Sequence, residues 1–238
     1  MQKFDLIIVC GDIHGKYNEV LNFINKYDIK NTAIIIAGDF GIGFKHHLAE
    51  ISGLNKFNNE LKESNTTIFV VRGNHDDPSY FFGKYNTSHI KFISDYTVLN
   101  INHINILCVG GAVSIDRTSR KKYTEGRGRD WWIDETFRLD LEKIKTLKNI
   151  DIVITHSSPS FAYPYIKKDF DDWAEKDEYL KEDVESERND ITTLYNNLIE
   201  NNNIKKWYYA HFHTHHEMFY DNTQFVCLNI NDFKEITI

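Results

Sequence analysis

Side chains that commonly bind divalent metals follow five short apolar runs of this chain. The runs cover residues 6–10, 33–37, 68–71, 152–154 and 207–210, and each is expected to form a buried strand. In open α/β sheets, ligands gather beyond the carboxyl ends of the strands, so side chains far apart in sequence can converge there. The sequence therefore predicts one metal site among these side chains: Asp12, His14, Asp39, Asn74, His75, His156, His211 and His213.

The residue types in this set indicate the metal and the reaction. Carboxylate, imidazole and amide groups without a thiolate suit Mn²⁺ best, with iron, zinc or nickel as alternatives. A carboxylate has two oxygens and can bridge two cations, which makes Asp39 a natural centre for two ions. Two ions about 3.5–4 Å apart can activate a bridging water and hold phosphoryl oxygens during in-line displacement. We expect direct attack by this hydroxide, without a phosphoenzyme.

Four apolar stripes at helical spacing lie between the expected strands, at 17–24, 54–61, 137–144 and 191–198. The first two alternate with the first three strands, so the first half of the chain reads β-α-β-α-β, which favours a largely parallel sheet. Two strands are expected within residues 97–109, and successive antiparallel strands are expected over the last thirty residues. This mixture predicts an α/β fold with a second sheet packed on the first. Nothing marks a domain boundary, so we expect a single domain over residues 1–238.

Bulk properties narrow the class of protein. At 238 residues the chain can bury a core without disulfides, and its three cysteines, Cys10, Cys108 and Cys227, lie in or beside apolar strands without a C-x-x-C spacing. We expect reduced thiols and a cytoplasmic protein. The apolar run after Lys3 is short and leads to Asp12, so we expect no signal peptide, and no apolar stretch has the length of a membrane span.

The charge of the chain is unevenly distributed. The formal net charge of -7 argues against strong nucleic-acid affinity. Residues 169–190 hold 11 acids against 3 bases and are expected to form a solvated helix or a lid. Residues 116–129 hold six bases and two acids. Guanidinium groups suit phosphate oxygens, so this second segment is the candidate substrate-binding loop, with Arg117, Arg120, Arg127 and Arg129.

Five motifs occur along the chain in a fixed order. They are Gly11-Asp12-Ile13-His14-Gly15, Gly38-Asp39, Gly73-Asn74-His75-Asp76, a lone strand-end His156 and a terminal H-x-H. In that order they resemble the calcineurin-like metallophosphoesterase superfamily, and the match runs from Asp12 to His213. The Gly-Gly turn at 110–111, the basic segment and the Trp131-Trp132 pair resemble bacterial and phage-type members. The resemblance implies a four-layer αββα sandwich, in which two mixed β-sheets are flanked by helices.

The resemblance also implies a division of the ligands. Asp12, His14, Asp39 and His213 would hold one metal, and Asp39, Asn74, His156 and His211 would hold the other. His75 would lie beside the metals and act on the leaving-group oxygen as a general acid or a charge stabiliser. Asp76 is the candidate to orient His75, with Asp77 and Asp95 as alternatives.

Two departures from the family pattern affect these assignments. The final motif begins with Ala210 rather than glycine. A second H-x-H at His213 and His215 follows directly, so the ligand pair could also be His213 and His215. The strand running directly into His211 favours His211 and His213. The Asp-Arg-Gly that follows the second motif in serine/threonine protein phosphatases is replaced here by Asp39-Phe40-Gly41.

The predicted function is therefore a dinuclear phosphoesterase that acts on phosphomonoesters or phosphodiesters, with a nucleotide as one candidate substrate. The alternatives are a serine/threonine-type protein phosphatase and a non-catalytic metal-binding interaction module on the same fold. A metallo-β-lactamase-type hydrolase is disfavoured because its H-x-H-x-D-H motif lies early in the chain, whereas the histidine-rich stretch here lies near the end.

Overall fold

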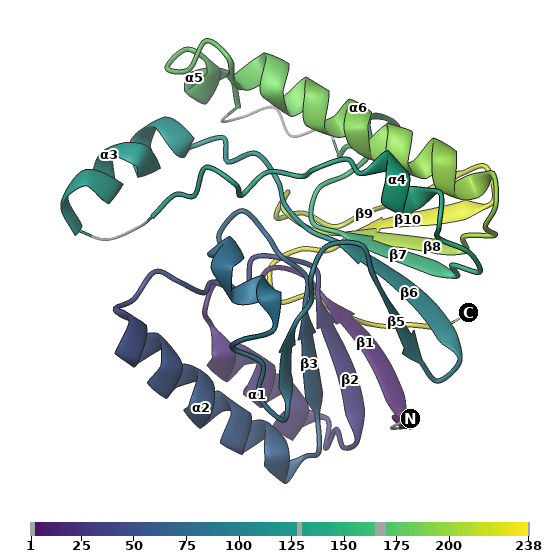
Figure 1. Cartoon of the computed structure of the whole chain (residues 1–238). Coiled ribbons are helices and arrows are strands. Elements are labelled where there is room, and N and C mark those ends of the chain that lie inside the picture. Colours follow the sequence, from purple (N-terminus) through teal and green to yellow (C-terminus); the bar gives the residue numbers. More distant parts are fainter. Residues whose placement is uncertain (1–2, 128–129, 165–169, 238) are drawn as a thin grey trace.

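Two β-sheets lie face to face at the centre of the molecule, and helices cover the outer face of each sheet (Figure 1). The computed structural model describes residues 3–127, 130–164 and 170–237. This is the expected α/β sandwich of two mixed sheets, with layers in the order helix, sheet, sheet, helix.

The first sheet has five strands in the order β11-β1-β2-β3-β4. Four of them are parallel, and β11 pairs antiparallel with β1 at the edge. Every residue of the central strand β2 is buried, which explains why its sequence lacks polar alternation. The strand bounds are β1 Leu6–Cys10, β2 Thr32–Ile36, β3 Thr67–Val70, β4 Ile90–Phe92 and β11 Phe233–Glu235.

The second sheet has six strands in the order β5-β6-β7-β8-β10-β9. Its four inner strands, β6, β7, β8 and β10, are parallel to one another. The edge strand β5 pairs antiparallel with β6, and the edge strand β9 pairs antiparallel with β10. The bounds are β5 Thr97–Ile101, β6 Ile104–Val109, β7 Ile152–Thr155, β8 Lys206–Tyr209, β9 His216–Tyr220 and β10 Thr223–Cys227.

Helices α1 and α2 cover the first sheet, and α4 and α6 cover the second (Figure 1). Helix α3 and the short helix α5 extend beyond the sheets on the side opposite the two chain ends. The helix bounds are α1 Tyr17–Lys26, α2 His47–Glu63, α3 Arg117–Arg127, α4 Leu141–Ile144, α5 Phe170–Ala174 and α6 Leu180–Ile199, with short 3-10 turns η1 Pro78–Phe82 and η2 Ser160–Ala162.

The hydrophobic core has three main layers that follow from the pleat of the strands. Successive side chains of a strand point to opposite faces. Ile34 of β2 accordingly packs with Leu54 and Phe57 of α2, whereas Ile35 packs between the sheets with Ile154 of β7. A third layer joins the second sheet to α6. The sandwich thereby fixes the strand ends of both sheets relative to one another.

Three local expectations were wrong. The last strands are not a simple antiparallel series, because β8 and β10 are parallel and β11 crosses to the first sheet. The basic segment is helical from Arg117 to Arg127 rather than a loop. The stripe at 137–144 is helical only over Leu141–Ile144, so Phe137 reaches the core from the preceding extended segment.

Two further observations concern the bulk expectations. All three cysteines are buried free thiols. Over the described part of the chain, no helix combines the length and the apolar character that a membrane crossing requires.

We expect Leu54→Ala in α2 to lower the free energy of unfolding by about 2–5 kcal/mol, because Leu54 is 2% exposed and truncation leaves a cavity. Leu48→Ala is the matched control, since Leu48 lies on the same helix and is 72% exposed. Urea unfolding of both variants measures the difference. Equal losses of stability would show that α2 does not pack on the first sheet as described.

Candidate metal centre

The predicted ligands follow the carboxyl ends of strands from both sheets. Asp12 and His14 follow β1, Asp39 follows β2, and Asn74 follows β3. The second sheet contributes His156 after β7 and the pair His211 and His213 after β8. The two sheets thus bring residues that are up to 201 positions apart to one edge of the sandwich.

One group of ligands is compact and partly open to solvent. The ligand atoms of Asp12, His14, Asp39 and His213 all lie within 4.8 Å of one another. Nε2 of His213 lies 2.9 Å from Oδ2 of Asp12 and 3.1 Å from Nε2 of His14. Both carboxylates are buried, whereas the side chains of His14 and His213 are 24% and 47% exposed. The group is the one that the sequence assigned to the first metal.

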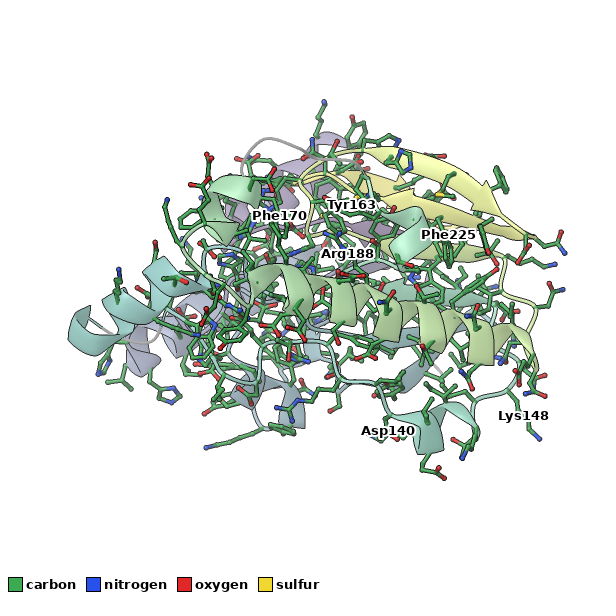
Figure 2. The ribbon with its side chains drawn as sticks, turned by 90° about the horizontal axis from the view of Figure 1, so that it is seen from above. Asp140, Lys148, Tyr163, Phe170, Arg188 and Phe225 are labelled. Carbon is green, nitrogen blue, oxygen red and sulfur yellow. The ribbon has the colours of Figure 1, made fainter. Side chains whose placement is uncertain are left out.

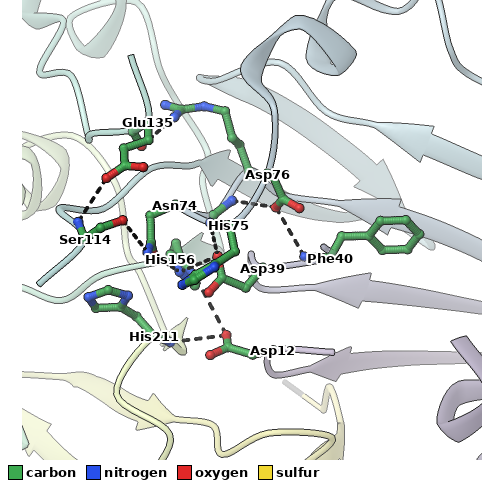
Figure 3. Close-up of polar contacts among 12 residues, drawn as sticks. Asp12, Asp39, Phe40, Asn74, His75, Asp76, Ser114, Glu135, His156 and His211 are labelled. Atoms are coloured by element: carbon green, nitrogen blue, oxygen red, sulfur yellow. Dashed lines mark hydrogen bonds and ion pairs between the residues drawn. The ribbon is translucent and has the colours of Figure 1, made fainter. Parts of the chain in front are cut away.

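The other group of predicted ligands lies deeper and shares Asp39 with the first (Figure 3). Nε2 of His156 lies 3.2 Å from Oδ1 of Asp39 and 3.0 Å from Oδ1 of Asn74. The imidazole rings of His156 and His211 have centroids 5.0 Å apart. Asp39 therefore places one oxygen toward each group, since its Oδ2 lies 3.9 Å from Nε2 of His14.

Hydrogen bonds fix which atoms of His156 and Asn74 face the centre. Nδ1 of His156 lies 2.8 Å from the carbonyl oxygen of Ala37. A carbonyl can only accept, so Nδ1 carries a proton, and Nε2 is the ring nitrogen that faces Asp39 and Asn74. Nδ2 of Asn74 donates to Oγ of Ser114 at 2.9 Å, which turns Oδ1 of the amide toward His156.

The backbone of the centre is strained at four of its seven predicted ligands. His14, Asp39, His211 and His213 have φ values of 45°, 50°, 69° and 49°. Non-glycine residues seldom adopt this left-handed region, and such residues cluster at functional sites. The turns after β1, β2 and β8 therefore aim these side chains at the cost of local strain.

Two motif glycines are needed because other atoms occupy the space of a Cβ. A Cβ on Gly38, which has φ of +98°, would lie 2.1 Å from Nδ1 of His156. A Cβ on Gly73 would lie 2.1 Å from the backbone nitrogen and Oδ1 of Asp39. The glycines of Gly38-Asp39 and Gly73-Asn74 thus allow the β2 and β3 turns to pack against each other and against His156.

The electrostatics of the centre fit a cation. Burial acts to raise the pKa of Asp39, but the imidazoles of His156, His75 and His14 hold it well below its usual range. Burial acts to lower the pKa of His156, and Asp39 more than offsets this and raises it to about 10. Oδ2 of Asp12 is buried and receives no hydrogen bond of acceptable geometry from the described residues. A divalent ion among these groups would supply the positive charge that the carboxylates require.

Asp76 holds two turns together. Its carboxylate accepts hydrogen bonds from the backbone nitrogens of Phe40, Gly41, Ile42 and Gly73 at 3.2, 2.7, 3.3 and 2.9 Å (Figure 3). Burial, reinforced by Asp39, raises the pKa of Asp76 to about 6. Asp76 therefore joins the turn after β2, which carries Asp39, to the turn after β3, which carries Asn74.

His75 lies beside the ligands, and its ring is close to the ring of His14, with centroids 5.2 Å apart. Its backbone nitrogen donates to Oδ1 of Asp39 at 2.7 Å. Burial lowers the pKa of the His75 imidazole. Asp77 accepts from Ser79 instead, and within the described structure no side-chain hydrogen bond joins the imidazole to any of its three candidate partners.

Two of the predicted substrate-binding arginines make internal contacts. Arg117 pairs with Asp177 at 2.6 Å and with Asp183 at 2.5 Å. Arg120 is buried and donates to Oγ of Ser114 and, at 3.2 Å, to the backbone oxygen of Asn74. The guanidinium of Arg120 thus supports the Ser114–Asn74 hydrogen bond. The side chain of Arg127, and Arg129 as a whole, lie outside the described residues.

His215, the last residue of the second H-x-H motif, pairs with carboxylates outside the predicted ligand set. His215 lies 3.2 Å from a carboxylate oxygen of Glu217 and 3.2 Å from one of Asp232. His211, in contrast, contacts the ring of His156, and His213 contacts Asp12. This geometry supports His211 and His213 as the ligand pair.

Sequence reasoning missed several supporting residues. Arg72 opens the Gly73-Asn74 motif, and its guanidinium bonds Asp95 at 2.9 Å and the backbone oxygen of Glu135 at 2.7 Å. Oε1 of Glu135 in turn accepts from the backbone nitrogen of Ser114 at 3.1 Å. The only available signal was Arg72 itself, a charged residue directly after an apolar strand.

A cavity of about 620 Å³ opens beside the centre. Its walls include Asp39, His75 and His213 from the centre, and it continues under α5 and α6. Aromatic and apolar residues also line it, among them Tyr163, Phe170, Trp173, Val184 and Phe212. A substrate bound at the centre would therefore have room for an organic group.

Residues 6–215 match the family model described as calcineurin-like phosphoesterase. The chain therefore belongs to the calcineurin-like phosphoesterase family, a metal-dependent family of phosphoester hydrolases. No curated protein matches the sequence.

Several solved structures resemble the chain in fold. A phosphopantetheinyl hydrolase from Mycobacterium tuberculosis is 11% identical, with a TM-score of 0.48 and coverage of 99% of this chain and 97% of that one. An archaeal phosphodiesterase is 12% identical, with a TM-score of 0.40 and coverage of 98% and 99%. A putative 5'-nucleotidase from Staphylococcus aureus is 13% identical, with a TM-score of 0.49 and coverage of 95% and 48%.

We expect Asp39→Asn to reduce the bound Mn²⁺ and to abolish the rise in melting temperature that Mn²⁺ gives the wild type, because the variant loses the charge shared by both groups. Asp28→Asn, at an exposed carboxylate, is the control. Elemental analysis and thermal unfolding measure the two effects. Wild-type metal content in Asp39→Asn would remove Asp39 from the centre.

Proposed function

We propose that this chain hydrolyses phosphoesters, monoesters or diesters, with two divalent ions and with water as the nucleophile. One observation carries the proposal. Asp39 belongs to a group of four ligands within 4.8 Å and also lies 3.2 Å from His156 of the other group. When bound, two ions lower the pKa of a water and offset charge on the phosphoryl oxygens. Mn²⁺ is the proposed metal, with iron, zinc or nickel as alternatives.

The chain's own residues would hold and orient the reactants. In this proposal Asp12, His14, Asp39 and His213 hold one ion, and Asp39, Asn74, His156 and His211 hold the other. His75 would stand on the leaving-group side, because it lines the cavity beside the ligands without belonging to either group. Asp76 would act as a positioning residue through the backbone of two turns.

Residues that line the cavity, rather than the arginines of α3, would contact the substrate. The predictions for Arg117 and Arg120 remain open to test, although their contacts with Asp177, Asp183 and Ser114 favour a supporting role. The proposed setting is one catalytic domain over residues 1–238 in the cytoplasm, which the three free thiols favour.

A substrate panel tests the proposal. The Mn²⁺-loaded protein should hydrolyse at least one of aryl phosphate, bis-aryl phosphate, a cyclic nucleotide, a dinucleotide and a phosphopeptide, and chelator treatment should remove this activity. Turnover of the phosphopeptide alone would favour a protein phosphatase. Bound metal with no turnover of any member would favour a non-catalytic module.

For the leaving-group role, we expect His75→Ala to keep both metals while kcat falls about 10²- to 10⁴-fold, the usual contribution of a general acid. His46→Ala, at an exposed histidine, is the control for the same truncation. Steady-state kinetics with metal analysis of each preparation gives the answer. Unchanged kcat in His75→Ala would exclude the role.

A further inference from the structure

Arg188 of α6 is the only lysine or arginine among the described residues that line the cavity beside the metal centre. It shares the cavity wall with His211, Phe212 and His213. Figure 2 shows Arg188 next to Tyr163, with Phe170 near the same end of α6. Arg188 belongs to the acidic segment 169–190 and not to the basic segment 116–129, which was the predicted place of substrate recognition.

The guanidinium of Arg188 is held by an aromatic face. Its Cζ lies 3.5 Å from the ring centroid of Tyr163 and 6.0 Å from that of Phe212. Stacking fixes the plane of a guanidinium, and a hydrogen bond to the Tyr163 side chain uses only part of its five N–H donors. Arg188 is therefore pre-oriented before any ligand binds.

Three other arginines that are buried or half-buried have carboxylate partners, and Arg188 differs from them. Arg72 pairs with Asp95 at 2.9 Å, and Arg117 pairs with Asp177 at 2.6 Å. Arg120 lies 3.7 Å from an oxygen of Glu135. No carboxylate of the described residues forms an ion pair with the half-buried Arg188.

The neighbouring Glu187 does not replace such a partner. Consecutive helical residues point in different directions, and no ion pair joins the two side chains. Burial raises the pKa of Glu187 to about 7, which makes it a weak counter-ion. A half-buried cation with only this weak counter-ion is unfavourable, and an anionic ligand would reduce this cost.

We propose that Arg188 binds non-bridging phosphate oxygens of the substrate and so acts as its recognition residue. The inference rests on the proposed phosphoesterase function. Paired donors match phosphate oxygens in geometry and in charge. The oxygens belong either to the phosphate at the metals or to a second phosphate group of the same substrate.

Calorimetric titration of the Mn²⁺-loaded protein with inorganic phosphate and with pyrophosphate, at constant free Mn²⁺, tests this proposal without requiring turnover. Arg188→Gln should raise the Kd of at least one anion about 10- to 100-fold, the usual loss for a hydrogen bond to a charged group. Arg188→Lys keeps the charge and the aliphatic stem and should give a smaller loss. Arg138→Gln, at an exposed arginine outside the cavity, should bind both anions like the wild type.

The pattern of losses identifies the source of the oxygens. Equal weakening of both anions would assign Arg188 to the phosphate at the metals, and weakening of pyrophosphate alone would assign it to a second phosphate group. Wild-type affinities in folded Arg188→Gln, or no anion binding by the wild type, would overturn the proposal. Arg188-dependent anion binding without turnover of any phosphoester would instead contradict only the phosphoesterase function.

Discussion

The arrangement of this protein depends on one buried carboxylate, Asp39, surrounded by imidazoles from both sheets. Its side chain lies 3.2 Å from His156 and 3.9 Å from His14, and its Oδ1 accepts the backbone hydrogen of His75 at 2.7 Å. A carboxylate buried in this position is poorly hydrated, so its negative charge is stable only with positive charge nearby. The close approach of Gly38 and Gly73, and the positive φ of Asp39 itself, are consequences of placing it there.

A second set of contacts makes this placement rigid. Asp76 joins the turns after β2 and β3 through four backbone hydrogen bonds, and Arg120 with Ser114 fixes the amide of Asn74. Precise metal geometry requires ligands whose own orientation is locked by such neighbours. The supporting residues come from the turns and from the segment after β6, so the centre is built largely by the connections between strands.

The gathering of these side chains at one edge of the sandwich could be anticipated from the sequence, because each of them is local to a strand end. An apolar run followed by Gly-Asp or Gly-Asn-His indicates both the strand and the residue at its carboxyl end. The parallel pairing of β8 with β10 could not be anticipated, because it depends on which edge of the second sheet receives the returning chain. The contacts of Arg117 with Asp177 and Asp183 could not be predicted from the sequence either. A basic segment and an acidic segment 60 residues apart look like separate surfaces until the fold brings them together.

A pair of ions that share Asp39 is tested most directly by electron paramagnetic resonance of the Mn²⁺-saturated wild-type protein. Ions about 3.5–4 Å apart and bridged by a carboxylate are exchange-coupled. We predict two Mn²⁺ per chain with the spectrum of a coupled pair. One ion per chain, or two ions with the spectrum of isolated Mn²⁺, would contradict it.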